Sequence, residues 1–154
     1  MSPTLLLFVP LLPALGALVN GVRAFANPLT PKNRSITNLF ALGTTALSAL
    51  IATYIVATAG EGWQYTYYTW IPSGIGHVGD STANFAVDFA FRIDHLSSTM
   101  LMIVTWIGFL IHVYATGYMA HESGYTRFFT YLNLFMFMML LLVLGANYLV
   151  MFVG

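Results

Sequence analysis

Long apolar stretches alternate with short polar connections along this chain. A helix needs about 20 mostly apolar residues to cross roughly 30 Å of hydrocarbon. Four stretches reach that length, at residues 4–22, 35–58, 96–118 and 128–153. Because these spans leave few residues for anything else, the pattern predicts an all-α membrane protein with about four transmembrane helices. Residues 1–154 are expected to form a single membrane domain.

The connection between the second and third spans has a different pattern. The segment "NFAVDFAF", residues 84–91, alternates large apolar positions with small or polar ones, which is the period of a strand. The preceding segment "QYTYYTWI", residues 64–71, is rich in aromatic and β-branched residues, which suit a strand or an interface with lipid headgroups. Turn-forming residues lie between the two segments, at Pro72, Gly74, Gly76 and Gly79. A β-hairpin is therefore expected between the second and third helices.

The composition supports a membrane protein and removes several kinds of chemistry. Hydrophobic residues make up 58% of the chain and charged residues 6%, whereas about a quarter of the residues in a soluble domain are charged. Five basic and five acidic residues cancel, so no basic surface for a nucleic acid is expected. The chain has no cysteine, which removes thiolate ligands for iron–sulfur clusters and zinc.

The charges are distributed unevenly among the connections. Arg23, Lys32 and Arg34 lie between the first two spans, and Arg127 lies between the last two. The middle connection has one basic residue, Arg92, and four acidic residues, namely Glu61, Asp80, Asp88 and Asp94. Because cytoplasmic loops of membrane proteins carry an excess of Lys and Arg, the two basic connections are expected in the cytoplasm. The hairpin and both termini are then expected on the outer side.

The third span carries a stripe of small and polar residues. Ser98, Thr105, Gly108, His112 and Thr116 recur at helical spacing and therefore share one face of the helix. An ionisable side chain is costly within a membrane, and such groups usually face the interior of a helix bundle or a water-filled cavity. The stripe that holds His112 is therefore expected to face inward.

Two roles are compatible with His112. The imidazole can be structural, neutral and hydrogen-bonded to a neighbouring helix. It can instead take up and release a proton, because the unperturbed histidine pKa of about 6.5 lies near neutral pH. His112 is accordingly the proton-transfer candidate, with Ser98, Thr105 and Thr116 as the polar stripe around it. No catalytic, cofactor-binding or metal-ligating residue is expected.

The second half of the chain resembles a known family. The run "FRIDHLSSTMLMIVTWIGFLIHVYATGYMAHESGYTRFFTYLNLFMFMMLLLVLGANYLVMFVG", residues 91–154, closely resembles the start of the L subunits of proton-pumping NADH:quinone oxidoreductase, respiratory complex I. These antiporter-like membrane subunits contain many more helices than this chain. The resemblance therefore implies the N-terminal portion of a longer antiporter-like subunit.

The resemblance implies a non-redox subunit that helps to form the proton-conducting part of the membrane arm. It implies no cofactor in this chain, with FMN and iron–sulfur clusters in other subunits of the complex. The implied partners are other membrane-arm subunits and lipid, in the inner membrane of a bacterium. Two explanations of the short length stay open: a second chain completes the subunit, or the sequence is a piece of a longer chain. Two alternatives stay open: a subunit of a multisubunit cation/proton antiporter, and a structural four-helix membrane protein that assembles its partners.

Overall fold

The computed structural model describes residues 3–26, 31–58, 62–78, 81–122 and 124–154. Helices and strands follow one another in the order α1 (Pro3–Ala26), α2 (Pro31–Thr58), β1 (Trp63–Val78), β2 (Ser81–Ile93), α3 (His95–Tyr118), α4 (Tyr125–Leu144) and α5 (Tyr148–Val153). The expectation of a mostly helical chain, with four long apolar helices and a hairpin between the second and third, is confirmed. α1 continues to Ala26 and α2 begins at Pro31, so both helices are longer than expected.

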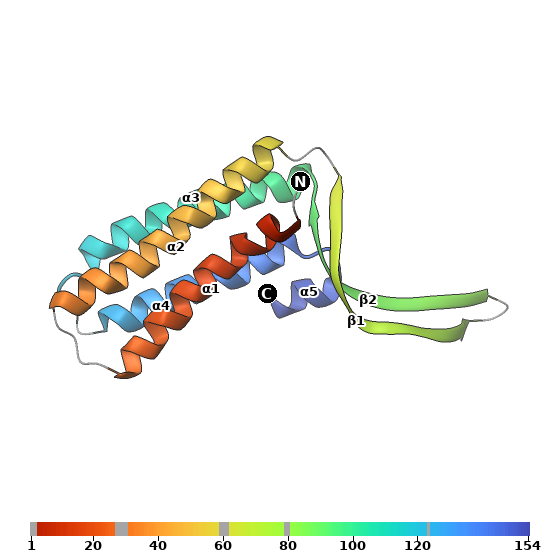
Figure 1. The fold of residues 1–154 in the computed structure, drawn as a ribbon, viewed down its shortest axis with the longest axis horizontal. Coiled ribbons are helices and arrows are strands. Elements are labelled where there is room, and N and C mark those ends of the chain that lie inside the picture. Colours follow the sequence, from red (N-terminus) through yellow and green to blue (C-terminus); the bar gives the residue numbers. More distant parts are fainter. Residues whose placement is uncertain (1–2, 27–30, 59–61, 79–80, 123) are drawn as a thin grey trace.

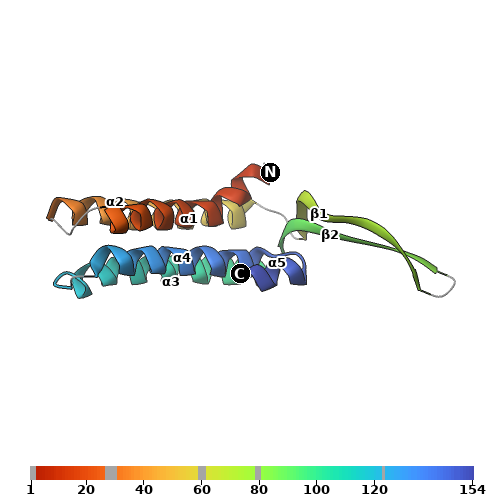
Figure 2. The ribbon, with the colours of Figure 1, turned by 90° about the horizontal axis from the view of Figure 1, so that it is seen from below.

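The four long helices form a bundle of two layers. α1 and α2 lie side by side in one layer, and α3 and α4 lie side by side in the other (Figure 1 and Figure 2). The last turns of α1 and α3 and the first turns of α2 and α4 lie at one end of the bundle, whereas the first turn of α1, the hairpin and α5 lie at the opposite end. Within the described residues, each of the four helices is long and apolar enough to cross a membrane.

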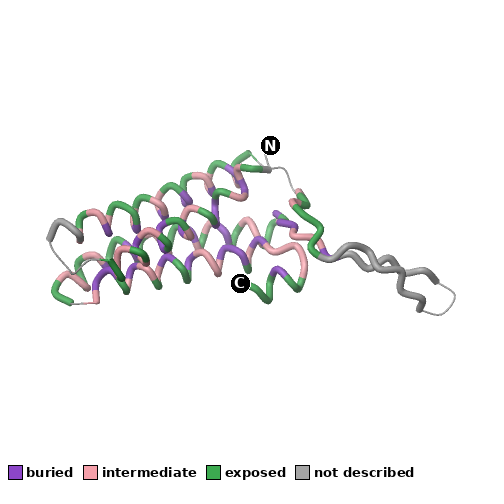
Figure 3. Tube along the Cα trace, turned by 60° about the horizontal axis from the view of Figure 1, so that its bottom comes forward, coloured by how far each residue is buried: buried purple, intermediate pink, exposed green. Residues whose placement is uncertain are grey.

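The helices meet through small side chains. The buried face of α2 includes Ala41, Thr45, Ser48 and Ala52, and small residues allow membrane helices to approach one another closely. The hydroxyl of Ser48 donates to the carbonyl oxygen of Val9 at 2.7 Å, which joins α2 to α1. Figure 3 shows the buried segments along the middle of the bundle, with exposed segments at its edges.

The hairpin projects beyond the helices as a two-stranded antiparallel ribbon (Figure 1). The expectation that Pro72, Gly74 and Gly76 separate the strands is wrong, because β1 continues through them to Val78. Proline cannot donate to a strand ladder and is tolerated at irregularities, and here the register shifts between Ile71 and Gly74. The remaining expected turn residue, Gly79, lies outside the described residues.

The fourth helix ends earlier than expected. A continuous span over residues 128–153 is wrong, because α4 begins at Tyr125 and ends at Leu144, and the short helix α5 folds back beside it (Figure 1). The chain is extended at Asn147, whose side-chain oxygen accepts from the Val150 N–H at 3.0 Å and so caps α5. Gly154 at the end of α5 stands directly against the α4 backbone.

Strand β2 supplies hydrogen-bond acceptors to the break between α4 and α5. The Ala146 N–H donates to the carbonyl oxygen of Ala90 at 3.0 Å, and the Asn147 amide donates to the carbonyl oxygen of Asp88. A helix end leaves backbone groups without partners, and burying them unpaired is costly. The base of the hairpin therefore stabilises the interruption of the fourth helix.

Candidate functional site

His112 lies on the inner face of α3 and is 1% exposed. Thr105, which is two turns earlier on the same face, is also buried. The ring of Phe129 on α4 packs near the imidazole, with ring centroids 6.2 Å apart. The pattern of the third span thus brings its histidine into the interior of the bundle.

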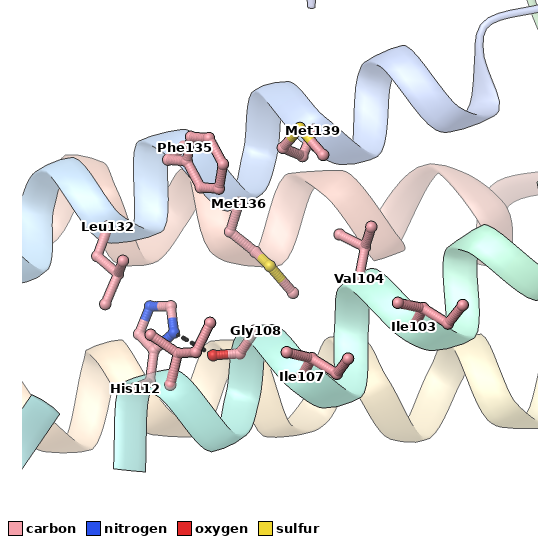
Figure 4. Close-up of a pocket in the computed structure, with 10 residues that line it drawn as sticks. Ile103, Val104, Ile107, Gly108, His112, Leu132, Phe135, Met136 and Met139 are labelled. Carbon is pink, nitrogen blue, oxygen red and sulfur yellow. Dashed lines mark hydrogen bonds between the residues drawn. The ribbon is translucent and has the colours of Figure 1, made fainter. Parts of the chain in front are cut away.

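The backbone fixes one nitrogen of the His112 ring. Nδ1 lies 2.7 Å from the carbonyl oxygen of Gly108, one turn earlier on α3 (Figure 4). A carbonyl oxygen can only accept a hydrogen bond, so Nδ1 carries the hydrogen. In the neutral ring this leaves Nε2 as the acceptor, and Nε2 is buried with no hydrogen-bond partner among the described residues.

Asn133 of α4 lies beside His112 in the interior of the bundle. It is 0% exposed, and neither its amide oxygen nor its amide nitrogen has a hydrogen-bond partner in the described part of the chain. Its Nδ2 atom is 3.1 Å from the position that a Cβ on Gly16 of α1 would occupy. The place where α1, α3 and α4 meet therefore holds two polar side chains with unmet hydrogen bonds, which is uncommon for buried groups.

The other residues of the polar stripe do not bond to His112. Each hydroxyl donates to a backbone carbonyl oxygen three or four residues earlier in the chain. The bonds run from Ser98 to Asp94, from Thr105 to Leu101 and from Thr116 to Val113, each at 2.7 Å. Thr105 is buried, whereas Ser98 and Thr116 are half-buried. The stripe shares a face of α3, but its hydroxyls form separate local bonds rather than a chain leading to His112.

A second group of buried polar residues lies between α1, α2 and α4. The Asn20 amide donates to the carbonyl oxygen of Thr37 at 3.4 Å, and the hydroxyls of Thr37 and Thr126 are also 3.4 Å apart. The amide oxygen of Asn20 is buried without a partner among the described residues. Sequence reasoning did not single out this group, although an asparagine within the apolar span 4–22 was the available signal.

Charged side chains lie outside this interior. In the described residues the buried polar set contains amides, hydroxyls and one imidazole, and no Asp, Glu, Lys or Arg. At one end of the bundle Arg34 donates to the carbonyl oxygen of Ala120, and its guanidinium lies over the ring of Tyr125 at 5.4 Å. At the other end Arg92 and Asp94 are 3.6 Å apart. The described residues also contain no group of acidic or histidine side chains that could hold a metal ion.

An apolar groove runs beside His112 between α3 and α4, with a volume of about 200 Å³ (Figure 4). Its apolar lining includes Ile103, Ile107, Ile111, Leu132, Phe135 and Met139. Such a lining offers water few hydrogen bonds. The groove therefore keeps this side of the imidazole dry.

Comparison with known proteins gives a consistent result. Residues 81–129 match the family described as NADH-ubiquinone oxidoreductase (complex I), chain 5 N-terminus. The whole chain is 34% identical to NADH-quinone oxidoreductase subunit L of Rickettsia bellii and covers 22% of that protein. It is 37% identical to subunit L of Escherichia coli, over 79% of the chain and 19% of that protein. It is 34% identical to NADH-ubiquinone oxidoreductase chain 5 of Hypocrea jecorina, over 96% of the chain and 20% of that protein. The chain thus spans about a fifth of the length of these relatives.

Proposed function

The chain corresponds to the N-terminal region of complex I subunit L, also called chain 5, and on this premise we propose that it serves as a membrane-arm subunit of a proton-translocating NADH:quinone oxidoreductase. Residues 1–154 form one membrane domain, the N-terminal portion of a longer antiporter-like subunit. The names of the relatives support this function over a cation/proton antiporter subunit or a structural assembly protein.

The observation that supports a part in proton movement is the buried, unpartnered Nε2 atom of His112. A polar atom without a partner is costly in a low-dielectric interior, and ionisable groups inside membrane spans mark proton and ion pathways. The Nδ1–H donates to Gly108 whether the ring is neutral or protonated, so the ring keeps its orientation when Nε2 gains or loses a proton. His112 is therefore one station on a proton path that continues through neighbouring spans and subunits.

The test replaces His112 with alanine in the assembled complex. We expect His112→Ala to lower proton pumping more than it lowers NADH oxidation with an artificial acceptor, because the redox centres lie in other subunits. Thr45→Val is the matched control, since among the described residues the Thr45 hydroxyl bonds only to carbonyls of its own helix. Unchanged pumping by an assembled His112→Ala complex would contradict the relay, and failed assembly would assign the imidazole a structural role.

This subunit acts without a cofactor of its own, and FMN and the iron–sulfur clusters reside elsewhere in the complex. The cysteine-free sequence supports this, because cysteine thiolates are the usual cluster ligands. Flavin analysis of the purified chain checks it, and stoichiometric flavin would overturn it.

The partners of the chain are other membrane-arm subunits and lipid. Large apolar side chains are exposed on the outer faces of the bundle, among them Leu18, Leu50, Leu110 and Phe135. Such faces suit contact with hydrocarbon or with other apolar helices. Mass spectrometry of the intact native complex would identify the co-purifying subunits, and a chain found free of any of them would contradict this.

In the inner membrane of a bacterium, the hairpin and both termini lie on the outer side, and the connections from Arg23 to Arg34 and from Met119 to Arg127 lie in the cytoplasm. These two connections contain Arg23, Lys32, Arg34 and Arg127, and the bias of Lys and Arg toward cytoplasmic loops supports this orientation. Because the chain has no cysteine, single introduced cysteines can test it. Asp80→Cys should react with an impermeant reagent in intact cells, whereas Asn33→Cys should not, and the reverse pattern would invert the topology.

A further inference from the structure

The environment of His112 restricts which atom can respond to a change of protonation. Nδ1 is committed to the carbonyl oxygen of Gly108 at 2.7 Å. Nε2 is therefore the atom that changes from hydrogen-bond acceptor in the neutral ring to donor in the protonated ring. A group that serves Nε2 in both states must offer both a donor and an acceptor, and it must lie beside the ring.

Asn133 meets both conditions. It lies next to His112 on the facing helix, its amide is fully buried, and neither amide atom has another partner within the described residues. The Nδ2 group donates and the Oδ1 atom accepts, and half a turn of the planar amide exchanges their positions. A carboxylate could only accept, and an aliphatic side chain could do neither.

We propose that Asn133 is the positioning residue for proton exchange at His112, presenting its amide nitrogen to the neutral ring and its amide oxygen to the protonated ring. This inference rests on the proposed proton exchange at His112, although it does not depend on how much that exchange contributes to pumping. The amide turn gives the buried imidazole a neutral partner in each state, so no buried carboxylate is needed.

Asn133 lies against α1 at a position without a side chain. The residue there is Gly16, and a Cβ on it would stand 3.1 Å from Nδ2 of Asn133 and 2.5 Å from the hydroxyl oxygen of Thr44. That hydroxyl donates to the carbonyl oxygen of Phe40 at 2.6 Å and has no hydrogen bond with the Asn133 amide. A side chain at Gly16 would crowd the amide, so the glycine removes one obstacle to its turning.

No other described titratable group takes the place of Asn133. The charged residues of the packed helices are Arg23 on α1, Lys32 and Arg34 on α2, and Arg127 on α4, all in the first or last turn of their helices. The buried set of the described residues contains none of them. Tyr125 of α4 is buried, but its hydroxyl donates to the Asn38 amide oxygen on α2. Among the described residues, the group beside Nε2 is therefore an uncharged one, the Asn133 amide.

Nuclear magnetic resonance of the full chain in lipid nanodiscs can observe the two side chains directly. With ¹⁵N-labelled histidine and asparagine, the ring nitrogens of His112 and the side-chain amide of Asn133 are followed between about pH 5 and pH 9, the range in which a histidine titrates. We expect both sets of signals to shift with the same midpoint. In His112→Gln the pH-dependent shift of the Asn133 amide should disappear, while Asn133→Leu identifies the amide signal by its loss.

An Asn133 signal that stays constant while His112 titrates would overturn the inference, and so would a His112 ring that does not titrate in this range. Pumping by Asn133→Leu in the complex gives an independent reading, expected to fall as in His112→Ala, with Thr45→Val as control. Shared titration with normal pumping by His112→Ala would leave this inference standing and remove the proposed relay. Impaired pumping by His112→Ala, with an Asn133 amide signal that does not change with pH, would support the relay and overturn the role of Asn133.

Discussion

Gly108 of α3 faces Met136 of α4 so closely that a Cβ at Gly108 would stand 2.5 Å from the Met136 sulfur and 2.8 Å from its terminal methyl. The same glycine supplies the carbonyl oxygen that holds Nδ1 of His112. One residue thus sets both the close approach of α3 to α4 and the orientation of the imidazole. A change at Gly108 should act on packing and on the candidate site together.

Gly108→Ala should destabilise the bundle by about 1 kcal/mol, at the low end of overpacking costs, because the new methyl meets only the flexible end of a methionine. Shortening that methionine should relieve the clash, so Gly108→Ala with Met136→Ala should cost less than the sum of the single changes. Free energies of unfolding in mixed detergent and dodecyl sulfate would measure both. Strict additivity would mean that the two residues do not touch.

Gly16→Ala and Gly43→Ala should have opposite effects. At Gly16 a methyl would stand 2.5 Å from the Thr44 hydroxyl oxygen and 3.2 Å from the Phe40 backbone oxygen, so a loss of about 2–3 kcal/mol is expected. At Gly43 a Cβ meets nothing within 4 Å, and alanine should be neutral or stabilising by up to about 1 kcal/mol through helix propensity. The same unfolding assay ranks the two variants, and a costlier Gly43→Ala would contradict the packing.

Asn147 has two separable bonds at the break between α4 and α5. Asn147→Ala removes the cap of the Val150 N–H and the bond to the Asp88 carbonyl oxygen, with an expected loss of about 1–2 kcal/mol. Asn147→Asp keeps an oxygen for the cap but loses the amide donor. Hydrogen exchange should therefore stay slow at the Val150 amide in Asn147→Asp and become fast in Asn147→Ala. Equal exchange in the two variants would argue against the cap.

Asp94 caps α3 and should make its stability sensitive to acid. The backbone N–H of Ser97, at 2.7 Å, and then the Ser97 side chain and Arg92, hold the pKa of Asp94 below its ordinary value. Such a group stabilises the fold above its unfolded pKa of about 3.9, and the contribution is lost as pH falls through the lower folded value. The difference in Tm between the wild type and Asp94→Asn should therefore shrink as the pH is lowered from about 5 to about 2. A difference that stays constant would rule out a charged cap.

Tyr67 in the hairpin should lose its phenol proton only at unusually high pH. Burial, and then the neighbouring Tyr65, raise the pKa of Tyr67 to about 12, and its ring packs edge-on against Phe91 with centroids 5.4 Å apart. Because the folded pKa exceeds the unfolded value of about 10, the contribution to stability is complete below pH 10 and is lost as the pH rises toward 12. The tyrosinate absorbance of the wild type minus that of Tyr67→Phe should show one phenol titrating near pH 12. A difference curve centred near 10 would place Tyr67 in solvent.

Apolar length and charge were sufficient to locate the four long helices, because crossing hydrocarbon constrains every residue of a span. The break at Gly145–Asn147 was missed for a physical reason. The residues around it are as apolar as a span, and the break depends on Ala90 and Asp88 of β2, far away in the chain. The local signal was Gly145 two residues before Asn147, because asparagine can cap a helix. That signal ends the helix only because β2 supplies hydrogen-bond acceptors there, and a hydropathy pattern carries no information about such a contact.

The sequence was sufficient to predict one of the two polar residues of the candidate site, His112, but not the other, Asn133. His112 stood out because it is a histidine within an apolar run, and helical spacing placed it with Thr105 on the buried face. Asn133 is an amide within the apolar fourth span, and its polarity alone indicated no partner. Its place beside His112 depends on how far α4 is rotated and shifted along α3. Asn20 was missed for the same reason, since each asparagine becomes informative only when its surroundings are known.

The hydrogen bonds between β2 and the interruption of the fourth helix also have a mechanical consequence. They join the base of the projecting ribbon to the residues that follow α4. Asn133 lies about three turns from that end of the helix. The ribbon is therefore a brace that holds one end of the helix carrying Asn133.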